Sequence, residues 1–254
     1  MARVGSWGWF EQTQGQLRPR DRLRLFGQGL IMQALELPWW LLGPLGLRPR
    51  NLARLDLDRI PVPDTPAAKE AEELCSQMRP AFLVPHSHRT YIWATILGTH
   101  RNLSYDAEVL YVSSLLHDLG LSEGHQRPPV PTCFTGIGAS AVQQIGNANG
   151  FSADKARTAA EAITLHMNLR QRPSEGIEAH LMATGTQLDS IGARYWHIDP
   201  RTVEAVLQRH PRSRVKQGFV ELFATQAERH PGSRAAFYRY LGSSLLFRFA
   251  PFAE

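Results

Sequence analysis

Apolar residues recur at helical spacing over most of this chain. In one clear stretch Ile177, Leu181, Thr184, Leu188 and Ile191 follow one another at intervals of four and three residues, the repeat of one helix face. Clusters of Pro, Gly, Asn and Ser separate such stretches, and the alternation typical of strands is nearly absent. The pattern predicts an all-α fold with helices over 67–79, 87–100, 104–118, 135–149, 153–167, 174–193, 200–209, 213–230 and 232–248.

The first 66 residues have a different pattern. Residues 1–19 show no period and are expected to be irregular, whereas residues 20–47 are rich in Leu and Trp, and residues 48–66 are a proline-rich linker. We therefore divide the chain into an N-terminal apolar helical segment with its linker, residues 1–66, and a helical domain, residues 67–254. In the first part of this segment the apolar residues share one face of a predicted helix, which Pro38 would bend or end. These residues are Leu23, Phe26, Leu30, Ile31, Ala34 and Leu35.

The apolar segment 20–47 is too often interrupted to span a membrane, which takes about 20 mostly apolar residues. Its apolar content exceeds that of a free surface helix. We expect the segment to be buried, either against the helical domain or across a homodimer. The rival interpretation is reversible peripheral contact with a membrane, helped by the basic flank Arg18–Arg24.

Composition narrows the class of protein. Over 254 residues the chain is 43% hydrophobic and 20% charged, as in a folded globular protein. Its net charge of +5 is mild, and the chain has no long basic run with interleaved aromatic residues, so we expect no nucleic-acid partner. Cys75 and Cys133 form no disulfide framework, and the polar N-terminus does not resemble a signal peptide, so a cytoplasmic location is expected.

His117 and Asp118 stand side by side at the end of an apolar helical run. A buried charge has to be paired or to bind a metal, and imidazole and carboxylate are both metal ligands. The alternative is a satisfied histidine followed by a capping aspartate. Three more candidates accompany this pair: His86 at the start of a helix, Asp189 on the shoulder of the stripe 177–191, and His166 at the end of a helix, which alone would be a capping or core histidine.

The order His, His-Asp, Asp across successive helices resembles the HD-domain superfamily of metal-dependent hydrolases, over roughly residues 67–200. The resemblance implies an HD-type multi-helix bundle, to which residues 1–66 would be an N-terminal helical appendage. It also implies one divalent metal, iron or zinc with manganese as an alternative, held by four ligands: His86, His117, Asp118 and Asp189.

Within that superfamily the short sequence motifs around these residues are most similar to those of the cyanamide hydratase-like branch. They are His86-Ser87-His88-Arg89, Leu116-His117-Asp118-Leu119-Gly120 with Ser122-Glu123, and Ala162-Ile163-Thr164-Leu165-His166. This likeness makes His166 a catalytic candidate and implies a small nitrile, such as cyanamide, as substrate. The chain departs from the pattern at Phe134-Thr135, where an acid is expected after Phe, and at Leu121, where phosphodiesterase-type members carry lysine.

The implied chemistry is attack by a metal-activated water on a small molecule. Asp118 or Asp189 would take the proton of the water, and His166 would protonate the developing anion. Arg89, three residues after His86, would either pair with a ligand carboxylate or clamp an anion. Two alternatives stay open at this point, a phosphohydrolase acting on a nucleotide or other phosphomonoester, and a degenerate metal-binding protein acting through its N-terminal helix.

Overall fold

The computed structural model describes residues 2–125 and 133–254. In these ranges the protein is a multi-helix bundle, which confirms the predicted all-α class, and its extended pairing is a single parallel bridge between Ala53 and Ile198. The α-helices are α1 Trp7–Thr13, α2 Pro19–Leu42, α3 Pro66–Ser76, α4 Leu83–His100, α5 Ala107–Leu116, α6 Thr135–Ala148, α7 Ala153–Leu165, α8 Ile177–Ile191, α9 Pro200–Arg209, α10 Val215–Arg229, α11 Arg234–Tyr240 and α12 Ser243–Phe249.

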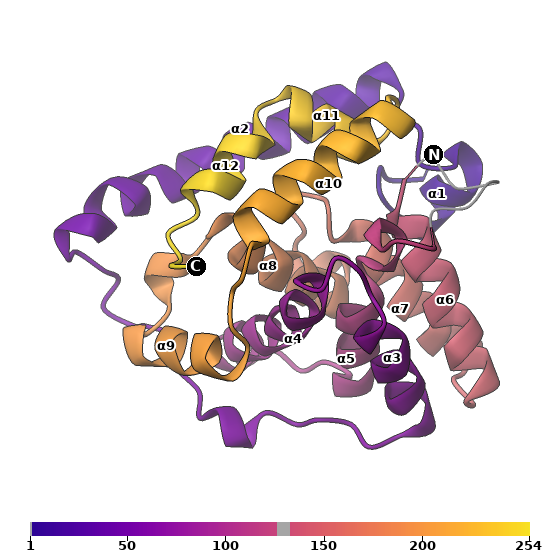
Figure 1. Cartoon of the computed structure of the whole chain (residues 1–254), viewed down its shortest axis with the longest axis horizontal. Coiled ribbons are helices and arrows are strands. Elements are labelled where there is room, and N and C mark those ends of the chain that lie inside the picture. The colour runs from indigo at the N-terminus through magenta and orange to yellow at the C-terminus, as the bar shows by residue number, and fades with distance from the viewer. Residues whose placement is uncertain (1, 126–132) are drawn as a thin grey trace.

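The centre of the bundle is formed by α4, α5, α7 and α8 (Figure 1). Helix α5 packs against α4, α7 and α8, and α8 also packs against α4 and α7. The stripe predicted on α8 points inward, with Leu181 and Leu188 fully buried. Each such side chain stabilises the fold by about 1.5–3 kcal/mol through the water it excludes. The core therefore lies among the helices that carry the candidate ligands.

Gly185 sets how closely α4 and α8 approach. A Cβ atom at this position would lie 2.4 Å from the carbonyl oxygen of Thr90 on α4. We expect Gly185→Ala to lower the free energy of unfolding by about 1–3 kcal/mol, because the two helices would have to separate. Urea unfolding followed by circular dichroism measures this loss.

The matched control for this substitution is Gly27→Ala on α2, where a Cβ atom would meet nothing within 4 Å. Alanine is the better helix former, so the control is expected to leave stability unchanged or raise it by up to about 1 kcal/mol. Equal effects of the two substitutions would show that the α4–α8 contact does not limit the spacing.

The expectation that residues 1–19 are irregular is wrong, because α1 lies within them. The hydroxyl of Ser6 caps this helix by accepting a hydrogen bond from the backbone N–H of Trp9 at 3.1 Å. Trp9 and Phe10 are buried, and the indole of Trp9 donates to Asp21 at 3.2 Å. Tertiary burial of two aromatic side chains, rather than a sequence period, holds this short helix in place.

Helix α2 continues through Pro38 to Leu42, so the proline does not end it. The carbonyl of Ala34, which Pro38 leaves without its helical donor, is on an exposed part of the helix where water can bond it. The prediction that the apolar face of this segment packs against the helical domain is wrong for Leu23, Leu30 and Leu35, which are exposed in the single chain. Its burial across a homodimer stays a prediction. The inward side of α2 carries other residues: Asp21, Leu25, Met32 and Glu36.

The C-terminal part of the chain forms two short helices in place of the single helix predicted for it. The helix predicted over 232–248 is divided into α11 and α12 at Gly242, which adopts a φ of +92° that favours glycine.

Helices α2, α11 and α12 lie together along the upper edge of the view in Figure 1. Among the described residues, no helix is both long enough and apolar enough to cross a membrane.

Candidate metal centre and adjoining pocket

Three of the predicted ligands meet in the interior. His86 lies in the first turn of α4, His117 is the residue that ends α5, and Asp118 follows it at the start of a short 3-10 turn, Leu119–Leu121. All three side chains are buried. Their candidate ligand atoms lie within 4.8 Å of one another, the arrangement of a group that could hold a metal ion.

The spacing of the three atoms fits a small divalent ion. Nε2 of His86 is 3.2 Å from Nε2 of His117, and Oδ2 of Asp118 is 3.4 Å and 3.2 Å from these two nitrogens. A tetrahedral ion with bonds of about 2.0–2.1 Å holds its donor atoms about 3.3–3.4 Å apart. Two imidazoles with one carboxylate form a donor set suited to catalytic zinc and also to non-haem iron, so the donors do not decide between these metals.

The protons of the two imidazoles point away from the centre. Nδ1 of His117 lies 2.8 Å from the carbonyl oxygen of Ser114, which can only accept, so Nδ1 carries the proton. Nδ1 of His86 lies 2.7 Å from Oδ2 of Asp189 and donates to it. In neutral imidazoles protonated at Nδ1, the two Nε2 atoms would present lone pairs to each other across 3.2 Å, an arrangement that a cation stabilises.

Electrostatics also favour a cation at this position. Burial by itself would raise the pKa of Asp118, but His117 and His86 hold that pKa far below its usual range, so the carboxylate is ionised. The carboxyl ends of α5 and α7 both reach the site, at His117 and His166. The negative ends of two helix dipoles thus add to the charge of Asp118.

Asp189 lies on α8 beside His86, outside the group of three. Arg89 binds it through two nitrogens, with Nε 2.7 Å from Oδ1 and Nη2 2.9 Å from Oδ2. Trp93 donates to Oδ1 at 2.9 Å, and Nη1 of Arg212 is 3.3 Å from Oδ2. Burial would raise the pKa of Asp189, but Arg89 and Arg212 hold it well below the usual range. The position of Asp189 suits a carboxylate that orients His86.

Arg89 is therefore fully engaged inside the protein. Besides Asp189 it donates to the carbonyl oxygens of His210 and Pro211, at 3.0 Å and 2.9 Å, and its side chain is fully buried. Of the two roles considered for Arg89, these contacts correspond to the ion pair with a carboxylate. With its guanidinium nitrogens bonded to Asp189 and to these carbonyl oxygens, Arg89 is not available to bind an anionic substrate.

His166 ends α7 and faces Asp118, with Nε2 4.0 Å from Oδ1. Its Nδ1 lies 2.7 Å from the carbonyl oxygen of Ile163 and so carries the proton. Burial, with the neighbouring His117, lowers the pKa of His166 to about 3. The imidazole is therefore neutral near pH 7, and its Nε2 carries a lone pair and no proton.

A pocket of about 230 Å³ adjoins the group, and Asp118 and His166 form part of its wall. Most of the wall is apolar, and none of the described residues that line it is lysine or arginine. No sequence motif marks the apolar lining residues of α2 and the C-terminal helices as parts of a pocket: Phe26, Leu30, Met32, Phe219, Phe223, Tyr238, Leu241, Leu246 and Phe247.

The departure at Phe134-Thr135 has a structural counterpart. Phe134 lines the pocket, whereas the hydroxyl of Thr135 accepts a hydrogen bond from Nη2 of the buried Arg234 at 2.8 Å. Arg234 also donates to the carbonyl of Thr164, near the end of α7, at 2.6 Å. The threonine thus belongs to a network that supports the end of α7, where His166 lies.

No family model matches the sequence. The chain is 26% identical over 174 residues to two proteins of Saccharomyces cerevisiae (strain ATCC 204508 / S288c), cyanamide hydratase DDI2 and cyanamide hydratase DDI3, with the match covering 68% of this chain and 77% of each relative. This similarity supports a cyanamide hydratase-like relationship and an enzyme that acts on a small molecule. Membership of the wider HD superfamily stays a prediction.

Proposed function

We propose that this protein adds water across the carbon–nitrogen triple bond of an uncharged cyanamide or nitrile that carries an apolar group. The observation that carries the proposal is the convergence of His86, His117 and Asp118 beside a pocket whose described wall has no positive charge. The distant similarity to cyanamide hydratases supports the same reaction class.

A divalent metal would be held by His86, His117 and Asp118, with Asp189 fixing the orientation of His86 through the bond to Nδ1. Four metal ligands remain the prediction from the sequence, and three with Asp189 behind them is the arrangement the geometry favours. When bound, the ion would lower the pKa of a coordinated water toward neutrality and polarise the nitrile.

His166 is the group we assign to proton transfer. Its neutral Nε2 accepts a proton from the attacking water and returns it to the nitrile nitrogen, while Oδ1 of Asp118, 4.0 Å away, stabilises the imidazolium formed in between. One carbon–oxygen bond forms and one carbon–nitrogen π bond opens. After a second proton moves from oxygen to nitrogen, the product is an amide. The proposal thereby extends the role predicted from the sequence, in which His166 only donated.

The pocket argues for an apolar substrate. Cyanamide has few atoms and would fill little of the 230 Å³, whereas the burial of an apolar substituent against aromatic side chains contributes about 25 cal/mol per Å². A phosphomonoester suits the pocket poorly, because a phosphate group is recognised by lysine, arginine or helix amino ends. We therefore rank the phosphohydrolase alternative second.

The test is a nitrile panel with metal-loaded protein. Protein reconstituted with Zn²⁺, with Mn²⁺ or, anaerobically, with Fe²⁺ is incubated with cyanamide, phenylcyanamide and benzonitrile, and amide or urea formation is followed by chromatography. We expect turnover with at least one metal, a higher kcat/KM for phenylcyanamide than for cyanamide, and loss of turnover after chelation that the same metal restores.

Two outcomes would overturn the proposal. One is protein with stoichiometric metal that leaves every nitrile unchanged. The other is release of phosphate from p-nitrophenyl phosphate or nucleoside monophosphates at a rate above that of any nitrile, which would transfer the site to the phosphohydrolase class.

A further inference from the structure

Nearly all the strongly exposed large apolar side chains of the described residues lie in two segments. Among the described residues, Val62 is the large apolar side chain of this kind outside them. We call the two segments together the apolar face. Its members on and after α2 are Leu23, Phe26, Leu30, Ile31, Leu35, Leu37, Leu41, Leu42, Leu45 and Leu47, and those on α11–α12 are Tyr240, Leu241, Leu245 and Phe249.

The mouth of the pocket opens in this apolar face. Phe26, Leu30 and Leu241 line the pocket, yet their side chains are 44%, 57% and 42% exposed. They come from α2 and from the connection between α11 and α12, which meet in the wall of the pocket. An apolar molecule resting on the face would therefore meet the entrance to the site without crossing a polar surface.

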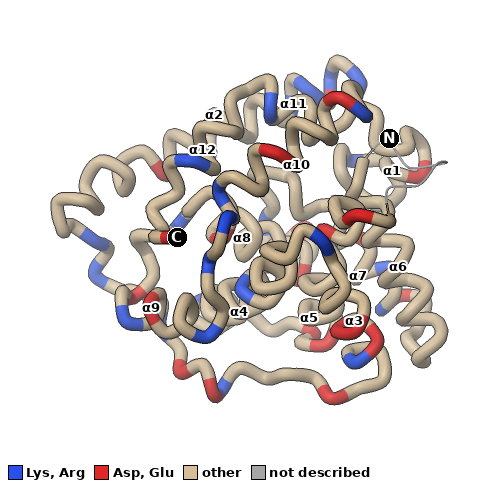
Figure 2. Tube along the Cα trace, in the orientation of Figure 1, with Lys and Arg blue, Asp and Glu red and all other residues tan. Residues whose placement is uncertain are grey.

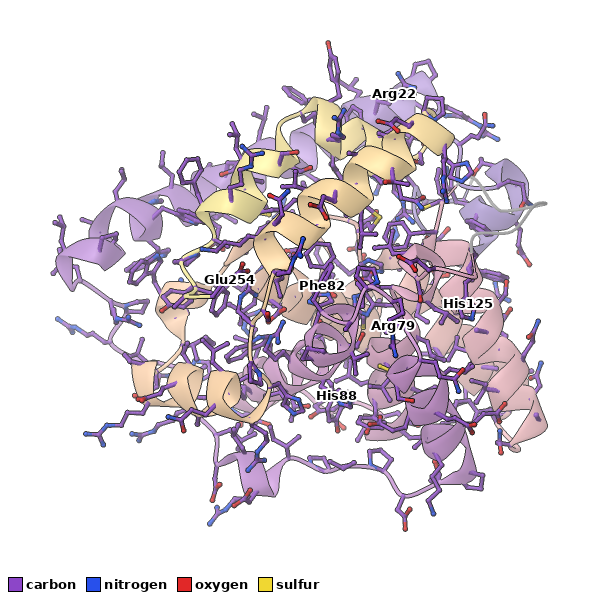
Figure 3. The ribbon with its side chains drawn as sticks, in the orientation of Figure 1. Arg22, Arg79, Phe82, His88, His125 and Glu254 are labelled. Carbon is purple, nitrogen blue, oxygen red and sulfur yellow. The ribbon has the colours of Figure 1, made fainter. Side chains whose placement is uncertain are left out.

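The charges on the two segments are of one sign at the surface. Arg20, Arg22 and Arg24 are exposed on α2, as are Arg239 and Arg248 on α11–α12. Figure 2 places basic positions along this edge, and Arg22 is labelled there in Figure 3. An arginine rim around exposed leucines is the composition of a helix that lies in the interface of an anionic bilayer.

The two acidic residues of residues 18–50 are turned inward. Asp21 is buried and accepts hydrogen bonds from the indole of Trp9 and from the backbone N–H of Arg18, at 3.2 Å and 3.0 Å. Glu36 is buried and accepts from the backbone N–H of Arg194 at 2.8 Å. Residues 234–249 contain no acid. No carboxylate on these segments therefore offsets the positive rim.

This charge pattern decides between two occupants of the face. A symmetric dimer sets the same surface of two subunits against each other, so neither copy of the face would offer an exposed acid to the arginines of the other. An anionic lipid surface offers negative headgroups to the rim and acyl chains to the leucines. We propose that α2 and α11–α12 form a docking face for an anionic membrane surface, on which the protein lies without spanning it.

Docking goes beyond the proposed reaction, and its test requires no turnover. Full-length metal-loaded protein is sedimented with vesicles of phosphatidylcholine alone and with vesicles that also contain phosphatidylserine. We expect it to pellet with the phosphatidylserine vesicles, to pellet far less with neutral ones, and to be released progressively as salt is raised.

Two sets of variants separate the apolar and basic contributions. Leu23→Ser with Leu35→Ser and Leu41→Ser removes exposed leucines that do not line the pocket, and Arg20→Gln with Arg22→Gln and Arg24→Gln removes the rim on α2. Each set should weaken vesicle binding by about tenfold or more. The controls are Val62→Ser and Arg157→Gln, exposed residues outside the apolar face that should leave binding unchanged.

Thermal unfolding of every variant confirms that the fold is retained. The proposal is overturned if wild-type protein stays in the supernatant with both kinds of vesicle, or if the variants bind as the controls do. A protein that is dimeric by light scattering, shows no vesicle binding and becomes monomeric on removal of the three leucines would assign the face to a second copy of the chain instead.

Discussion

Asp118→Asn is expected to remove the metal and to abolish nitrile hydration. The substitution keeps the shape of the side chain but takes away the one negative charge in the group of three, where His86 and His117 lie 3.4 Å and 3.2 Å from Oδ2. A ligand change of this kind should weaken metal binding on the order of a hundredfold or more. Metal content by mass spectrometry and amide formation report the two effects.

The matched control for Asp118→Asn is Asp154→Asn, an exposed aspartate in the first turn of α7. It should retain full metal content and activity. Stoichiometric, tightly bound metal and unchanged turnover in Asp118→Asn would remove Asp118 from the ligand set.

His166→Gln is expected to separate catalysis from metal binding. The wild-type imidazole donates through Nδ1 to Ile163 and faces Asp118 through Nε2 at 4.0 Å. Glutamine retains polarity but cannot exchange a proton, so turnover should fall by about 10²–10⁴. Metal content should stay near that of the wild type, because Nε2 of His166 is not in the group of three donor atoms.

For this prediction His230→Gln is the control, since His230 follows the end of α10 and lies away from the pocket wall. A parallel loss of metal and rate in His166→Gln would make His166 a ligand. If neither changed, His166 would have only a structural role at the end of α7.

The fold class could be predicted from the sequence because the helical period and the breaks between helices are local. The stripe on α8 is buried as its spacing indicates, with Leu181 and Leu188 in the core. Helix α1 could not be found in this way, since its seven residues are held by burial of Trp9 and Phe10. For α2 the spacing indicated an apolar face correctly, but a period carries no information about what covers that face.

His86, His117 and Asp118 could be selected as candidate metal ligands from the sequence, and in the structure their side chains lie close together. The sequence could not indicate the position of Asp189 relative to them. That position depends on Arg89 and Trp93 from α4 and on Arg212, which follows α9, all of which bond the same carboxylate. The spacing of residues within one short stretch of sequence cannot predict contacts between residues so far apart along the chain.

Arg212 gives the contact to Asp189 a wider consequence. It is buried, donates to the backbone carbonyl of Asp189 and lies 3.5 Å from the carboxylate of Glu254. One chain of contacts therefore runs from His86 through Asp189 and Arg212 to the C-terminal residue. Because linkage between two binding events is reciprocal, any coupling along this chain of contacts would act equally in both directions: the free energy by which metal binding at His86 changed the attachment of Glu254 would equal the free energy by which that attachment changed metal binding.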